Sequence, residues 1–256
     1  MRIITLTTDL GWRDYYVAVI KGTLLSRQPD IQVVDITHDI PHYNIVEGAF
    51  VLKNAYPNFP SGTIHLVSIL DYPSPESDFL VIRHDDHYFI GPNNGLFSLA
   101  FEERPEEVYR LSSGSAHVFG LKNLFAEAIA HICEDKPLSD IGERNPHMVE
   151  RISLQPVVSK DQLRGTILHI DHYDNAIVNI RRELFEKIRN GRQFQLFFKR
   201  HDPIVRLSNR YCDVPVGEPL CLFNSAGLLE IALNMDKAST LLGLSLDDTI
   251  QINFLE

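Results

Sequence analysis

The sequence predicts an α/β protein in two parts: an N-terminal domain with a mostly parallel sheet and flanking helices, then a small, barrel-like, mostly β domain. Strand-like and helix-like stretches alternate over about the first 145 residues, whereas short β-type runs dominate the rest. A chain of 256 residues also has room for two domains, at roughly 100–200 residues each. We place these domains at residues 1–148 and 149–256, with the boundary near 145–155.

The N-terminal half shows the alternation directly. Apolar side chains recur at helical spacing, for example through Val19, Ile20 and Leu24, and predict helices over residues 14–28, 44–56 and 121–134. We expect strands over residues 2–7, 31–36, 63–70 and 106–111, and a hairpin over 79–92 that turns at Asp85 and Asp86. Such alternation favours a largely parallel sheet covered on both faces.

The C-terminal half is predicted to be mostly β. We expect one helix over residues 181–190. The expected strands, which favour a small barrel, cover residues 165–171, 175–180, 194–200, 218–224 and 227–233.

Composition narrows the class of function. The formal net charge is −10 without a basic stripe, so a nucleic acid is not an expected partner. No apolar run approaches the roughly 18 residues of a membrane span. Cys133, Cys212 and Cys221 form no CxxC pattern and are odd in number, which argues against a disulfide framework. We expect a cytoplasmic protein outside the membrane, with Cys133 filling the core and no metal site.

The stretch TTDLG, residues 7–11, places a carboxylate where a strand gives way to a helix. Ligands of α/β proteins bind at that junction. A carboxylate there suits a ribose, because each oxygen can accept a hydrogen bond from a hydroxyl group. Taken alone, the stretch is more simply explained as a helix N-cap, with Asp9 or Asp14 accepting from free backbone amides.

Three more stretches place polar residues at strand ends. GPNNG, residues 91–95, has turn composition. FNSAG, residues 223–227, is either a turn or a carboxylate-binding nest of amides. IDHYDN puts Asp171, Tyr173 and Asn175 at alternate positions, which point the same way in extended backbone and would suit an aminated, ring-bearing ligand.

In this order, the stretches resemble one family. The chain is similar to the S-adenosylmethionine hydroxide adenosyltransferases and their relatives, the chlorinases and the fluorinase. The stretches that carry this similarity are TTDLG with DYYVAVIKG, VVDITHDI, IGPNNGL, IDHYDNAIVNI and NSAGLLEIA. The similarity runs from Thr7 to about Ala232. It implies an α/β domain joined to a small β-barrel, and homotrimers that bind the ligand between the first domain of one subunit and the second of its neighbour.

The resemblance also implies residue roles on the adenosine part of the substrate. Asp9 would take the ribose hydroxyls of S-adenosylmethionine, and Tyr43 would close the pocket near the reacting carbon. Asn175 would bond the adenine edge between the rings of Tyr173 and Tyr211.

On the methionine part, the resemblance implies that Asp171 holds the ammonium group. Ser225 would lie at the carboxylate, with Asn224 beside it. S-adenosylmethionine would be the substrate, and no cofactor is implied.

The catalytic set departs from the family. Hydroxide-transferring members orient a water with an Asp–Arg–His set, whereas the halogenases use a dry anion pocket. Asp71 matches the Asp, but Ser77 or Asp78 stands where the Arg is expected. Gly120, followed by Leu121, stands where the His is expected.

Asp71 and its neighbour Tyr72 are therefore the catalytic candidates. Loss of a neighbouring cation should raise the pKa of Asp71. His42 and His117 are candidate replacements for the imidazole, and nothing in the sequence places either of them.

Four functions stay open at this level. Water as nucleophile would give adenosine and L-methionine, and halide would give a 5′-halo-adenosine. Leu121 argues against a hydroxyl-lined anion pocket, though an apolar neighbour could also keep one dry. A protein that binds S-adenosylmethionine or adenosine without turnover would keep the ligand residues and lose the catalytic set. The second-domain stretches argue against a generic nucleotide-binding α/β domain.

Overall fold

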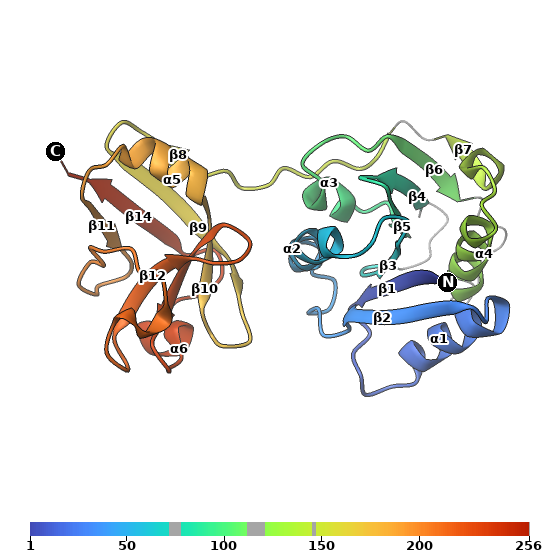
Figure 1. The fold of residues 1–256 in the computed structure, drawn as a ribbon, viewed down its shortest axis with the longest axis horizontal. Coiled ribbons are helices and arrows are strands. Elements are labelled where there is room, and N and C mark those ends of the chain that lie inside the picture. The colour runs from blue at the N-terminus through green and yellow to red at the C-terminus, as the bar shows by residue number, and fades with distance from the viewer. Residues whose placement is uncertain (72–77, 112–120, 145–146, 256) are drawn as a thin grey trace. The chain divides into compact units, whose positions relative to one another are not determined.

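The computed structural model of the chain describes residues 1–71, 78–111, 121–144 and 147–255. These residues form two compact units, Met1–Ile152 and Ser153–Glu256 (Figure 1). Among the described residues, no helix is long and apolar enough to cross a membrane.

The first unit is built on a mixed sheet, with strand order β2-β1-β3-β5-β4-β6-β7. The parallel part comprises β1 (Arg2–Thr8), β2 (Ile31–Thr37), β3 (Ile64–Ser68) and β5 (His87–Pro92). The antiparallel part adds β4 (Phe79–His84), β6 (Glu107–Leu111) and β7 (Gly142–Arg144). The expected strands are confirmed, including the hairpin turn at Asp85 and Asp86, which both have positive φ. The short β7 was not predicted, because three residues carry no periodicity.

Helices cover both faces of this sheet, as predicted. One layer contains α1 (Tyr16–Arg27) and α4 (Leu121–Cys133), and the other contains α2 (Ile45–Ala55), η1 (Tyr56–Asn58) and α3 (Leu96–Ala100). Adjacent residues of β3 show the division: Leu66 packs in the core under α1 and α4, and Val67 packs in the core under α2 and α3. Cys133 packs at the edge of the first core, as expected. The short η2 (Leu138–Asp140) precedes β7.

The helix after TTDLG corrects one expectation. The first residue of α1 is Tyr16, and Tyr15 at the N-cap makes no side-chain capping bond. The N-cap interpretation of Asp9 and Asp14 is therefore wrong. By contrast, Asn44 caps α2 by accepting a 3.1 Å hydrogen bond from the Glu47 amide.

A buried histidine pair lies in the first unit. His65 on β3 is fully buried; its Nδ1 lies 2.7 Å from Thr5 Oγ1 and its Nε2 lies 3.2 Å from His87 Nδ1. Burial, with a smaller contribution from His87, lowers the pKa of His65 to about 3. The neutral form of His65 is therefore the one that the fold accommodates.

This burial makes stability depend on pH. The pKa of His65 is about 3 in the folded state and 6.5 in the unfolded chain, so the unfolded chain binds more protons between these values. Stability therefore falls as the pH drops below 6.5, by about 2 kcal/mol between pH 7 and pH 5. Urea unfolding at both pH values measures the drop, which should shrink by that amount in His65→Phe; an equal drop in the variant would contradict the assignment.

The second unit is a curled sheet with strand order β11-β14-β9-β10-β13-β12, and β8 pairs with β9. Its strands are β8 (Val157–Val158), β9 (Gln162–Ile170), β10 (Ala176–Arg181), β11 (Phe194–Phe197), β12 (Pro219–Phe223), β13 (Leu228–Leu233) and β14 (Thr249–Phe254). Its helices are α5 (Arg182–Arg189), η3 (Tyr211–Asp213) and α6 (Ala238–Leu242). The strand β14 was missed, although Ile250, Ile252 and Phe254 alternate as a half-buried strand should.

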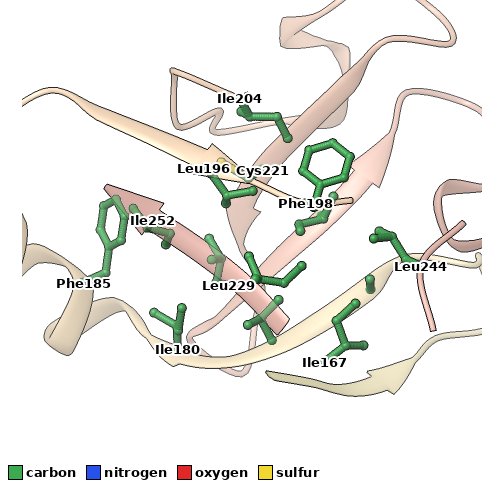
Figure 2. Close-up of a cluster of buried hydrophobic side chains, with 14 of the residues drawn as sticks. Ile167, Ile180, Phe185, Leu196, Phe198, Ile204, Cys221, Leu229, Leu244 and Ile252 are labelled. Atoms are coloured by element: carbon green, nitrogen blue, oxygen red, sulfur yellow. The ribbon is translucent and has the colours of Figure 1, made fainter. Parts of the chain in front are cut away.

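The sheet curls around one apolar core, which includes Phe185 of α5, Leu229 of β13 and Ile252 of β14 (Figure 2). Isolated bridges, Leu196 to Ile204 and Leu207 to Cys221, connect the 204–207 segment to both edge strands. Gly165 on β9 has no room for a side chain, since a Cβ would lie 2.7 Å from side-chain atoms of β10. The predicted barrel-like domain is therefore present as a half-barrel.

Candidate functional site

The polar stretches singled out in the first unit gather at one edge of its sheet. Thr8, Ser68 and Pro92 end three parallel strands, and their carboxyl ends lie on the same side. Ligands of open α/β sheets bind in the crevice outside these ends. The loops that follow carry Asp9 and Asp71, so this edge is the candidate site of the first unit.

Asp9 is held by two backbone amides from distant loops. Its Oδ2 accepts hydrogen bonds from the amides of Tyr43 (3.0 Å) and Leu70 (3.3 Å). Both donors have left-handed backbone, with φ of 66° and 49°. Non-glycine residues in that region cost energy and cluster at functional sites. Asp9 is 8% exposed, while Tyr43 beside it is 70% exposed.

His42 lies in the same loop as Tyr43. Its Nδ1 is 3.0 Å from the Asp9 carbonyl oxygen, so the ring contacts the backbone of the TTDLG loop. His117, the other candidate imidazole, lies outside the described residues.

Asp71 follows β3 and turns back onto it. The Ser68 hydroxyl donates a hydrogen bond to Asp71 Oδ2. Burial raises the pKa of Asp71; the Ser68 bond opposes this change, and the nearby Asp9 adds to it. The raised pKa agrees in direction with the expectation from the sequence, but its main cause is burial and not the loss of a neighbouring cation. Asn94 fixes the turn before Asp71 by donating a 2.9 Å hydrogen bond to the Ile69 carbonyl.

No ion pair joins Asp71 to a Lys or Arg within the parts of the chain that the structure covers. Asp78, one of the two candidates for the position of the family's Arg, instead pairs with Arg110, at 3.3 Å between Oδ1 and Nε. Tyr72, Ser77 and Gly120 lie outside the described residues, as does the side chain of Leu121.

A buried polar chain that sequence reasoning missed holds the TTDLG loop. Thr8 Oγ1 lies 2.8 Å from His38 Nδ1, and His38 Nε2 lies 3.0 Å from Asp35 Oδ1. Lys21 donates a 2.6 Å hydrogen bond to the other oxygen of Asp35. The His38 carbonyl also accepts from the Gly11 amide at 2.8 Å. The DITH stretch, residues 35–38 at the end of β2, was the signal that could have identified this support.

In the second unit, the IDHYDN stretch is a turn, so the argument from extended backbone is wrong. Residues 171–175 join β9 to β10, and Asp174 has a φ of 70°. The Asp171 carboxylate accepts from the Asn175 amide (2.8 Å) and from Asn175 Nδ2 (3.1 Å). Asp171 and Asn175 are thus brought together by the turn, while the Tyr173 ring is 77% exposed.

The FNSAG stretch is also a turn. Asn224 Oδ1 accepts from the amides of Ala226 (3.0 Å) and Leu228 (3.2 Å), and its carbonyl accepts from the Gly227 amide (3.0 Å). These amides are therefore not free to form the alternative carboxylate-binding nest. Ser225 lies exposed at the tip of the turn.

Tyr211 lies near the IDHYDN turn and is tied to a residue that the sequence did not reveal. Its hydroxyl donates a 2.7 Å hydrogen bond to Glu230 Oε1. Burial and this bond raise the pKa of Tyr211, with smaller contributions from Asp171 and Tyr173. The two tyrosines, Asp171 and Glu230 thus form one cluster in the second unit.

Comparison with known proteins decides the family. Two family models match the chain: the SAM hydroxide adenosyltransferase N-terminal domain over residues 4–142 and the corresponding C-terminal domain over residues 165–251. The chain belongs to this family. It is 31% identical to the (R)-S-adenosyl-L-methionine hydrolase of Methanocaldococcus jannaschii, over 98% of this chain and 95% of that protein. A fluorinase of an Actinoplanes species is 27% identical over 91% of each protein.

A solved structure supports the same assignment. An uncharacterised conserved protein from Thermotoga maritima is 28% identical and superposes with a TM-score of 0.88, over 98% of this chain and 99% of that one. The adenosyltransferase family thus accounts for both units of the fold.

One group with metal-ligand chemistry lies apart from the site of this adenosyltransferase-family protein. His84, Asp85 and Glu106 offer ligand atoms within 4.8 Å of one another. Asp85 Oδ2 already accepts from the Tyr56 hydroxyl at 2.9 Å, and Glu106 Oε1 accepts from the Asp85 amide at 3.2 Å. Both acids are exposed and have partners, so we assign the group no function.

Proposed function

We propose that the protein hydrolyses S-adenosylmethionine by displacement at the ribose 5′ carbon, giving adenosine and L-methionine. The observation that carries this proposal is the half-buried Asp71 carboxyl beside Asp9 at the carboxyl edge of the parallel strands. The relatives named (R)-S-adenosyl-L-methionine hydrolase support it.

In this proposal, Asp9 binds the ribose hydroxyls and Tyr43 covers the reacting carbon. The firm hold on Asp9 supports this role, because preorganised acceptors lose little entropy on binding. Asn175 bonds the adenine edge with the side-chain groups that remain after Nδ2 donates one of its two hydrogens to Asp171. The rings of Tyr173 and Tyr211 flank the base.

The methionine part is bound by Asp171 at its ammonium and by Asn224 and Ser225 near its carboxylate. The support for Asp171 is its position in a cluster of acidic and phenolic groups. No cofactor is required for this reaction.

The chemical step needs positioning more than acid catalysis. A water oxygen attacks the 5′ carbon, the carbon–sulfur bond breaks, and its electron pair stays on the sulfur of neutral methionine. The water loses a proton, which Asp71 in its ionised form accepts. Holding the nucleophile in line can contribute roughly 7–11 kcal/mol.

Halide displacement is the second candidate, because relatives in the same family are named fluorinases. Incubation of the purified protein with S-adenosylmethionine, with and without chloride, separates the functions. We expect adenosine in both reactions. A 5′-chloro-adenosine product would establish halogenation, and binding without any product would establish a binding protein.

We also propose that the protein is a homotrimer in the cytoplasm, with each site completed by residues of two subunits. The exposed Tyr43 and Tyr173 rings and the absence of a disulfide among Cys133, Cys212 and Cys221 support this proposal. Light scattering should give three times the mass of 29.2 kDa, or a multiple of it. A monomer that binds S-adenosylmethionine at full affinity would refute the shared site.

A further inference from the structure

Glu230 is a buried acid on a strand whose neighbouring residues form the core. Leu229 and Ile231 of β13 point into the half-barrel core (Leu229 is labelled in Figure 2). Glu230 lies between them and points to the opposite face. It is nevertheless only 2% exposed.

The partners of Glu230 are neutral. Tyr211 donates its hydroxyl hydrogen at 2.7 Å, and the Asn224 side chain lies close enough to favour the ionised form of Glu230. Because Asn224 Oδ1 already accepts from two amides, its NH₂ group is the part that can act on Glu230. In the described part of the chain, no Lys or Arg pairs with Glu230. Burying a carboxylate without a partner cation lowers the stability of the folded protein, which favours a role for Glu230 in binding and not in folding.

A second acid lies close to this carboxylate. Burial raises the pKa of Glu230, and Asp171 adds to the effect, while the bonds from Tyr211 and Asn224 oppose it. The cross-strand neighbours Ile177 and Leu222 are apolar, and His169 lies one strand beyond Ile177 in the same row. Among the described residues, the titratable groups that act on Glu230 are therefore Tyr211 and Asp171, and His169 stands two strands away in the same row.

We propose that Glu230 is a further residue of the ligand site, which acts with Asp171 to select a positively charged ligand and holds Tyr211 in place for it. This inference rests on the proposed function, because S-adenosylmethionine carries an ammonium and a sulfonium whereas adenosine carries neither. A cation bound close to Glu230 and Asp171 reduces the repulsion between their two negative charges. Glu230 thus discriminates the substrate from adenosine, the product without a positive charge.

The proposal predicts that binding is coupled to a proton. A cation stabilises the ionised form of Glu230 and lowers its pKa, so binding releases a proton at a pH where the empty site is partly protonated. Affinity for a cationic ligand should therefore increase with pH through the raised pKa of Glu230, whereas affinity for adenosine should not.

Calorimetry on the full-length protein tests this. The cationic probe is sinefungin, a stable analogue with an amine in place of the sulfonium, and the neutral probe is adenosine. Glu230→Gln keeps an acceptor for Tyr211 and removes the charge. We expect this substitution to weaken the binding of sinefungin by at least tenfold and the binding of adenosine by less than about threefold. Titrations of Glu230→Gln at several pH values above 4.5, in buffers of different ionisation enthalpy, should show less proton release than titrations of the wild type.

Two controls separate charge from packing. Tyr211→Phe removes the hydroxyl and keeps both acids, so it should weaken the two probes about equally. Asp171→Asn should discriminate between the probes as Glu230→Gln does. Equal weakening of the binding of both probes by Glu230→Gln would overturn the proposal, as would wild-type sinefungin binding that releases no proton at any pH above 4.5, the ordinary pKa of a Glu carboxyl. Failure of the wild type to bind either probe would instead overturn the proposed function, and this inference with it.

Discussion

Asp71→Asn should lower the rate of adenosine formation at least tenfold while the affinity for S-adenosylmethionine stays within a few-fold. The asparagine fits the same space and can accept the Ser68 hydrogen bond, but it cannot take a proton from water. General-base assistance typically contributes a hundred- to ten-thousandfold. Single-turnover assays with product chromatography measure the rate, and calorimetry with sinefungin measures binding.

The pH profile gives an independent check. Burial raises the pKa of Asp71, and only the ionised form accepts a proton. The wild-type rate should therefore increase with pH through that raised pKa, and the slope should disappear in Asp71→Asn. Ser68→Ala is the matched control: it removes a hydrogen bond that opposes the shift, so it should move the profile to higher pH. Wild-type turnover in Asp71→Asn would transfer the role to Tyr72 or a histidine.

Asp9→Ala should abolish detectable binding of both S-adenosylmethionine and adenosine, a loss of roughly a hundredfold or more. The ribose is common to both ligands, and each hydrogen bond to a charged group is worth roughly 1.5–3 kcal/mol. The substitution also removes the acceptor of the Tyr43 and Leu70 amides, which should cost about 1–3 kcal/mol of stability. Calorimetry and urea unfolding measure the two effects.

Asp9→Asn separates these effects. It retains an oxygen that can accept from the two amides, so stability should stay near the wild-type value while ribose affinity falls. Asp39, an exposed acid near the same edge, provides the control: Asp39→Asn should change neither quantity. Unchanged adenosine affinity in Asp9→Asn would refute the ribose assignment.

Local pattern predicted most of the fold, because side-chain periodicity records which face of an element is buried. The helices α1, α2 and α4 and the hairpin at Asp85 and Asp86 are where periodicity and turn composition placed them. The same reasoning misassigned residues 171–175, since a tight turn and a strand end can share one short polar sequence. It also passed over β14, whose alternating Ile250 and Ile252 did carry the signal.

The sequence by itself determined the family and the placement of Asp9 and Asp71 after strands, since both follow from residue order along the chain. Only the tertiary structure decided what these acids contact. The amides that hold Asp9 come from residues 34 and 61 positions away, and the hydroxyl on Glu230 comes from 19 positions away. Such contacts depend on how distant loops pack, and the energy of a buried charge depends on its neighbours in space. In the sequence, Glu230 is one polar residue within an apolar strand. Only the tertiary structure shows that its carboxyl group is buried beside Tyr211 and that this burial opposes its ionisation.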